Sequence, residues 1–170
     1  FGDNETILVK LLPSNRKPLL DSKKDLPAGP IISNASGAKS QNRTYPDMLK
    51  NKNDEINFEN IITSELYKIT LSGNKTLFKS ADMFAGQSLS PDGNYIMITT
   101  IQKPFSYIVP LIRFPMKSVV YDKSGREVKI VNETPLTEIM PKGFMAVQKG
   151  KRSLMWRNDK PATLAFVQAL

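Results

Sequence analysis

The sequence contains no histidine and no cysteine, and these two absences exclude several kinds of site. Without histidine, a Ser-His-Asp triad cannot form from these residues, and the commonest ligand of transition metals is missing. Without cysteine, disulfides, thiolate metal sites and cysteine nucleophiles are excluded. A Gly-x-Ser-x-Gly nucleophile elbow is absent as well. We therefore expect this chain to carry no catalytic residue, no metal site and no cofactor.

Long apolar runs are also missing. No run approaches the ~18 residues that a membrane-spanning helix needs, and the first residues show no basic-then-apolar signal. The lack of cysteine fits the cytoplasm as well as an extracytoplasmic space, and of the two we slightly favour a periplasmic or other extracytoplasmic location. The 24 basic side chains outnumber the 16 acidic ones but are spread over many presumed turns. This distribution predicts a solvated surface and neither a nucleic-acid nor a membrane partner.

What the 170 residues do contain is short, β-branched and aromatic apolar runs, separated by 12 prolines and 9 glycines. Frequent turn residues exclude long helices, and short runs of this composition are typical of strands. Because 40% of the residues are hydrophobic, the chain can bury a core. The predicted class is therefore mainly β.

The tetrapeptide Ser90-Pro91-Asp92-Gly93 predicts a tight turn between two antiparallel strands. A weaker copy of this turn and of the strand after it lies 89 positions earlier, and another lies 67 to 68 positions later. The hairpin that turns at Ser124-Gly125 has its own copy, 52 positions earlier. The two offsets differ because residues 13–63 form a longer link between the second and third strands than residues 102–116 do. One insertion thus explains both offsets.

A four-stranded unit that repeats with insertions of variable length is typical of β-propeller blades. We predict an all-β, partial β-propeller of about two and a half four-stranded antiparallel blades, with long insertions between the second and third strands. Residues 1–80 would hold the end of one blade with insertion 13–63, residues 81–132 a complete blade with insertion 102–116, and residues 133–170 the start of the next. Propellers close with about four to eight blades, so we expect a fragment of a longer polypeptide. The alternative is an unrelated β-sandwich whose turns look alike by chance.

The insertions differ in composition. The first is rich in proline, lysine and aspartate, and we expect a short helix near residues 46–51 and another helical turn that starts at Asp54. The second, residues 103–115, is apolar and rich in proline. Such a loop is poorly soluble unless it packs on something.

Both insertions contain distinctive segments, which are Arg43-Thr44-Tyr45, Pro104-Phe105-Ser106-Tyr107 and Arg113-Phe114-Pro115. Together with residues 29–32, 54–55, 94–95, 109–110, 141–144, 156–157 and 159–164, with Asp47, Leu49, Lys50 and Lys103, they carry a family resemblance. From residue 27 to residue 170 the chain resembles the amino-terminal propeller of the glutamyl-endopeptidase-like branch of the prolyl oligopeptidase family. Ser90-Pro91-Asp92-Gly93 is a weak sign because many propellers have it, whereas the segments of the insertions are specific.

The resemblance implies a two-domain serine peptidase whose propeller shields a carboxy-terminal α/β-hydrolase domain. An endopeptidase that prefers acidic residues would need a cation, so Arg113 is a candidate substrate-binding residue together with Arg43, Tyr45 and Tyr107. Arg113 can instead pair with an acid of its own insertion or of the adjacent blade, which we favour. Arg43 and Tyr45 can instead anchor the long insertion onto its scaffold. Tyr107 can instead be a packing residue of the proline-rich loop. Trp156 is expected in the blade core.

Our functional hypothesis is a non-catalytic propeller segment of a bacterial serine peptidase that gates peptide access to an active site elsewhere in the full-length protein. Its partners would be the remaining blades, the hydrolase domain and peptide substrate. The alternative is a stand-alone TolB-like propeller that binds a protein partner. Because open blades leave unpaired strand edges, the chain alone is expected to be marginally stable, oligomeric or aggregating.

Overall fold

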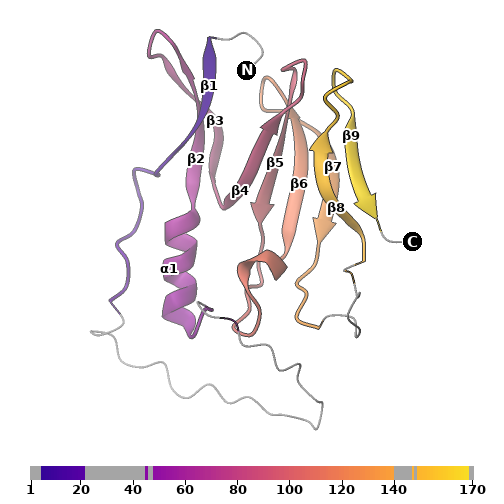
Figure 1. Ribbon diagram of the computed structural model, residues 1–170. Helices are drawn as coiled ribbons and strands as arrows, with labels where there is room; N and C mark the ends of the chain where they lie inside the picture. Colours follow the sequence, from indigo (N-terminus) through magenta and orange to yellow (C-terminus); the bar gives the residue numbers. More distant parts are fainter. Residues whose placement is uncertain (1–4, 22–44, 46–47, 140–146, 148, 169–170) are drawn as a thin grey trace.

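The computed structural model describes residues 5–21, 45, 48–139, 147 and 149–168. Nine strands in this part of the chain form three antiparallel sheets (Figure 1). The first sheet contains β1 (Thr6–Leu11), β2 (Ser64–Thr70) and β3 (Lys75–Asp82) in that order. The second contains β4 (Phe84–Leu89), β5 (Tyr95–Ile101), β6 (Met116–Asp122) and β7 (Glu127–Thr134), and the third pairs β8 (Lys151–Trp156) with β9 (Leu164–Gln168). The mainly β class is thereby confirmed.

The strand positions follow the predicted offsets. β1 begins at Thr6, which is 89 positions before the start of β5, and β2 and β3 each begin 52 positions before β6 and β7. Leu89 pairs with Ile96 in the second sheet, and the corresponding pair in the third sheet is Trp156 with Leu164. The insertions therefore lie between equivalent strands of the first and second sheets, as predicted.

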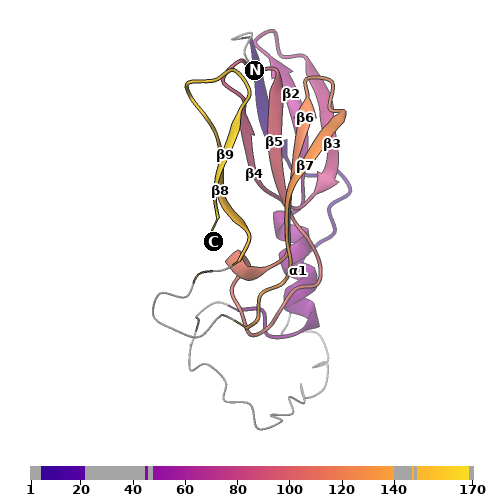
Figure 2. The same cartoon turned by 90° about the vertical axis from the view of Figure 1, so that its right-hand side faces the viewer.

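The three sheets lie side by side in chain order, and the two views of Figures 1 and 2 agree on this arrangement. Leu66 of the first sheet packs with Phe84, Ile96 and Ile98 of the second in one buried cluster. Between the second and third sheets, the indole nitrogen of Trp156 donates a hydrogen bond to the carbonyl oxygen of Ser88 at 3.1 Å. Packing on both faces of the second sheet explains why β5 is apolar on both sides. This stacking is consistent with a partial propeller-like fold.

The turn at residues 90–93 has the predicted chemistry. Gly93 has a φ of 67°, which favours glycine, and its N–H donates to the carbonyl oxygen of Ser90 at 2.8 Å. The Asp92 carboxylate accepts hydrogen bonds from the Ser90 hydroxyl at 2.6 Å and from the N–H of Asn94 at 3.0 Å. The N–H of Asp92 also donates to the carbonyl oxygen of Pro161 at 3.0 Å, so this turn contacts the turn of the third sheet.

One helix lies in the described part of the first insertion, and its position corrects a prediction. Residues 48–51 are not helical, and residues 46–47 lie outside the described residues. Instead α1 runs from Lys52 to Ile62. The helix begins there because Asn51 has an extended backbone and its side chain accepts a hydrogen bond from the N–H of Asp54 at 2.9 Å, which caps the helix. The predicted turn at Asp54 is thus the first turn of an 11-residue helix.

The β6–β7 turn contains a carboxylate whose protonation should affect stability. Asp122 accepts hydrogen bonds from the Ser124 hydroxyl at 2.6 Å and from the N–H groups of Arg126 and Ser124 at 3.0 and 2.9 Å. These bonds, the hydroxyl first, lower the pKa of Asp122 from 3.8 to about 2. Because the pKa is lower in the folded state, the carboxylate stabilises the fold fully above about pH 4 and loses this effect as the pH falls toward 2.

Replacing Asp122 by asparagine is therefore expected to destabilise the protein at neutral pH, and this difference should shrink as the pH falls from about 4 to about 2. Urea unfolding of both proteins across this range measures the effect. A difference that does not change with pH would show that the charge of Asp122 contributes nothing.

Candidate functional site

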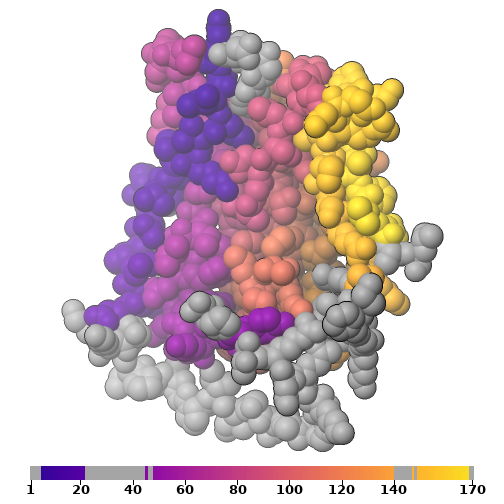
Figure 3. Space-filling model, in the orientation of Figure 1, coloured from indigo at the N-terminus to yellow at the C-terminus, as the bar shows by residue number. Residues whose placement is uncertain are grey.

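Both insertions lie at the same end of the sheets (Figure 1). The first leaves β1 and returns through α1 to β2, and the second connects β5 to β6 through a short 3-10 helix, η1 (Leu111–Arg113). In the space-filling view the salmon-coloured second insertion reaches the surface below the second sheet, beside the purple residues that precede α1 (Figure 3). Two segments far apart in sequence thus form one structural unit.

Three phenylalanines join the two insertions. Phe58 of α1 meets Phe105 and Phe114 of the second insertion edge to face, with ring centroids 5.1 and 5.9 Å apart. Phe105 and Phe114 stack on each other at 5.4 Å. We call these three residues the aromatic cluster. They pack with Ile101 and Val109 in the second buried core, so the apolar second insertion packs on the first. Its composition had predicted that it packs on something, without naming the partner.

Polar contacts surround the aromatic cluster. The Tyr107 hydroxyl donates a hydrogen bond to the Glu55 carboxylate of α1 at 2.8 Å, and the Lys103 ammonium pairs with Glu59 at 2.7 Å. Lys52 also contacts Glu55 at 2.7 Å, and its hydrogen bond, followed by that of Tyr107, lowers the pKa of Glu55. Tyr107 is therefore bound to α1, and Glu55 stays ionised as its partner.

Arg113 lies at the end of η1, and its guanidinium donates a hydrogen bond to the Tyr45 hydroxyl at 3.2 Å. The guanidinium carbon is 5.9 Å from the centre of the Tyr45 ring. Two of the predicted site residues thus meet, one from each insertion. Among the described residues, no carboxylate pairs with Arg113, so the acidic partner that we favoured is not found there. Arg43 lies outside the described residues.

Two residues of this unit were not recognised from the sequence. The sequence placed Glu55 and Phe58 only at a predicted helical turn that starts at Asp54, and it related neither residue to the second insertion. The only signal in the sequence was that Phe58 and Ile62 are four positions apart, which places them on one face of α1. That face packs on the second insertion.

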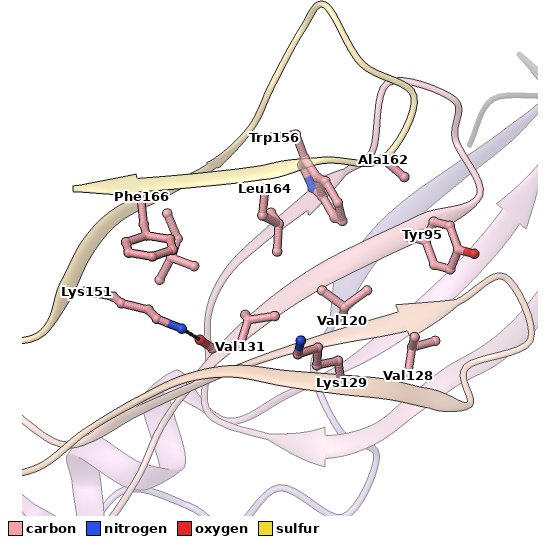
Figure 4. A pocket seen from close by; sticks show the side chains of 11 residues that line it. Tyr95, Val120, Val128, Lys129, Val131, Lys151, Trp156, Ala162, Leu164 and Phe166 are labelled. Carbon is pink, nitrogen blue, oxygen red and sulfur yellow. Dashed lines mark hydrogen bonds between the residues drawn. The ribbon is translucent and has the colours of Figure 1, made fainter. Parts of the chain in front are cut away.

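A groove of about 400 Å³ lies between the second and third sheets (Figure 4). Its lining is mainly apolar, and its residues are Tyr95, Val120, Val128, Lys129, Val131, Lys151, Leu154, Trp156, Ala162, Leu164 and Phe166. The Lys151 ammonium donates to the carbonyl oxygen of Val131 at 3.3 Å and lies 4.9 Å from the centre of the Phe166 ring. Trp156 therefore serves as a contact between sheets, but it is only half-buried and lines the groove, so it does not lie in the blade core as expected.

Comparison with known proteins gives two curated relatives, both named "Probable glutamyl endopeptidase, chloroplastic". The rice protein (Oryza sativa subsp. japonica) is 36% identical over 167 residues, which cover 98% of this chain and 18% of that protein. The Arabidopsis thaliana protein is 36% identical over 168 residues, 95% of this chain and 17% of that protein. The chain is similar to one segment of these peptidases.

The chain thus spans less than a fifth of the length of the relatives it matches. No family model and no solved structure matches it. In the described part of the chain, no helix is both long and apolar enough to cross a membrane. The similarity supports a peptidase-related segment.

Proposed function

We propose that the chain is a non-catalytic propeller segment of a serine peptidase and gates peptide access to an α/β-hydrolase active site elsewhere in the polypeptide. The observation that carries this proposal is the 36% identity over nearly the whole chain to two proteins named as glutamyl endopeptidases. The absence of histidine means that these residues contain no Ser-His-Asp triad of their own. The active site would therefore be formed by other residues of the same protein.

The repeated strand offsets support the propeller part of the proposal. Equivalent strands recur in three successive sheets, and adjacent sheets pack against each other. A ring of such blades encloses a channel that is too narrow for folded proteins, so only peptides or unfolded segments would pass. We also propose that the protein is bacterial and lies outside the cytoplasm. The two relatives, in contrast, are plant proteins named as chloroplastic.

The groove beside β7 supports the expectation of further strands. The strands β4 and β5 of the second sheet are equivalent to β8 and β9 of the third, and in the second sheet β6 and β7 come next. A third and a fourth strand added to the third sheet would cover Val120, Val128 and Val131, which line this groove. Its occupant would then be the next two strands of the same polypeptide, and the remaining blades and the hydrolase domain are the proposed partners.

The 170-residue chain by itself is expected to self-associate. The groove leaves apolar surface exposed, and the outer edge of β9 pairs with no further strand among the described residues. Sedimentation velocity over a range of concentrations measures this. Substituting Val128 and Phe166 by lysine should reduce the association. A cooperative, monodisperse monomer at all concentrations would contradict the proposal of open blades.

The main test is the intact mass of the native gene product together with labelling by a serine-reactive fluorophosphonate probe. We expect a protein of propeller-plus-hydrolase size that the probe labels. It should cleave short peptides but leave intact folded proteins that contain the same cleavage sequence. A reading frame that ends within one or two further blades would contradict the proposal and favour a stand-alone interaction module.

A further inference from the structure

We propose that one face of the first sheet binds a further blade of the same polypeptide. We call this surface the outer face, and its members are Ile7, Val9, Tyr67 and Ile69. The inference rests on the proposed function, because it assigns to the remaining propeller the surface that it contacts. The first sheet stands at one end of the row of sheets, so one of its faces packs on the second sheet and the other points away (Figure 1).

The strand register places the four side chains of the outer face together. Ile7 pairs with Ile69, and Val9 pairs with Tyr67, across β1 and β2. Side chains alternate along a strand, so Leu8, which lies between Ile7 and Val9, points to the opposite face. Leu8 packs against the buried cluster that the first sheet shares with the second. The outer face is therefore the face that points away from the second sheet.

The repeat gives each residue of the outer face an equivalent in the second sheet. Ile96 pairs with Tyr121 and Ile98 with Val119, which is the register of the first sheet moved by 89 positions in one strand and 52 in the other. These equivalents face the first sheet, since Ile96 and Ile98 share a buried cluster with Leu66 of β2. The outer face thus occupies the positions that bind a neighbouring sheet one repeat later.

Burial differs sharply between the two sets of residues. Ile96 and Ile98 are 0% and 2% exposed, whereas Ile7 is 56% exposed and Val9 and Tyr67 are only half-buried. The outer face is nevertheless built from aliphatic and aromatic side chains, as its covered equivalents are. Contiguous apolar surface of this kind marks an interaction site. A neighbour that packs as the first sheet packs on the second would bury it.

The occupant we infer is a blade whose facing side chains resemble Leu8, Leu66 and Phe78. These three residues of the first sheet supply its side of the cluster that buries Ile96 and Ile98. A second copy of the chain is a poorer occupant, because its own Leu8, Leu66 and Phe78 already pack on its second sheet. A propeller closes with about four to eight blades. The relatives are more than five times as long as the matched segment, which leaves length for such a blade in the same polypeptide.

The experiment measures the accessibility of the outer face in the full-length native protein, through the single variants Ile7→Cys and Val9→Cys. Labelling with N-ethylmaleimide, followed at the peptide level by mass spectrometry, should be at least about tenfold slower than in Leu71→Cys, because the reagent reaches a covered thiol only when the sheets separate. Leu71→Cys is the matched control. Leu71 is 80% exposed in the β2–β3 turn, and its equivalent, Lys123, is exposed although the second sheet is covered.

Photo-crosslinking identifies the occupant of the outer face in the same full-length protein. With p-benzoylphenylalanine incorporated at position 7, we expect a crosslink within one polypeptide, to a segment outside residues 1–170 that has the alternating apolar pattern of a strand. Peptide mass spectrometry locates this segment. A crosslink to a second copy, which doubles the mass on a denaturing gel, would overturn the inference, and so would a crosslink to a segment without this pattern.

Labelling of Ile7→Cys and Val9→Cys as fast as that of Leu71→Cys would also overturn the inference. The proposed peptidase function would stand in that case, provided that the protein reacts with the serine probe and cleaves peptides. A reading frame that encodes no further blade would overturn both the proposed function and the inference.

Discussion

Replacing Phe114 by alanine is expected to lower the free energy of unfolding by about 3–5 kcal/mol, the usual cost of removing a buried aromatic ring. The ring is 3% exposed and contacts both Phe58 and Phe105, so its loss opens a cavity between the two insertions. Urea unfolding measures the loss, and limited proteolysis within residues 102–115 reports whether the second insertion has been released.

The matched control for this prediction is Ile112→Ala, two positions away in the same loop. Ile112 is 77% exposed, and its truncation should change stability by no more than about 0.5 kcal/mol. If Phe114→Ala and Ile112→Ala had equally small effects, the insertions would not pack together in solution.

Replacing Gly125 by alanine should destabilise the protein more than the same change at Gly73. The two glycines occupy equivalent turns, 52 positions apart, with almost the same φ of 86° and 87°. An L-residue in this left-handed region costs about 1–2 kcal/mol at either position. At Gly125 the added methyl group would also lie 3.1 Å from the carbonyl oxygen of Phe78 in the first sheet, whereas nothing lies within 4 Å at Gly73.

This crowding should add about 1 kcal/mol or more to the cost of Gly125→Ala, because the carbonyl of Phe78 belongs to β3 and cannot move freely. The midpoints of urea unfolding of Gly125→Ala and Gly73→Ala measure the difference directly. Since the backbone strain cancels in this comparison, the difference reports the contact between the first and second sheets. Equal midpoints would contradict the close packing of these sheets.

The strand offsets were predictable from the sequence because turn residues act locally. Gly93 and Gly125 adopt positive φ values and Asp92 bonds the backbone two residues on, whatever the rest of the fold does. The helix was harder to place. A short helix was predicted near residues 46–51, yet residues 48–51 are not helical and α1 begins only at Lys52, because the capping hydrogen bond of Asn51 was not recognised.

The contacts of the insertions could not be predicted in the same way. Glu55 and Tyr107 are 52 residues apart, and Tyr45 and Arg113 are 68 residues apart. Nothing in the local pattern relates these positions, so the contact of Glu55 with the second insertion was not predicted and Arg113 was expected to pair with an acid. The fold brings them together because both insertions leave equivalent strands of adjacent sheets at the same end.

The sequence by itself determined the mainly β class, the register of the repeated strands, the place of the insertions and the absence of a Ser-His-Asp triad, because each depends on residue types or short spacings. The tertiary structure alone decided which side chains of the insertions meet and that Arg113 has Tyr45 as its partner. Those contacts join residues far apart along the chain, and only the stacking of one sheet on the next determines the distance between them.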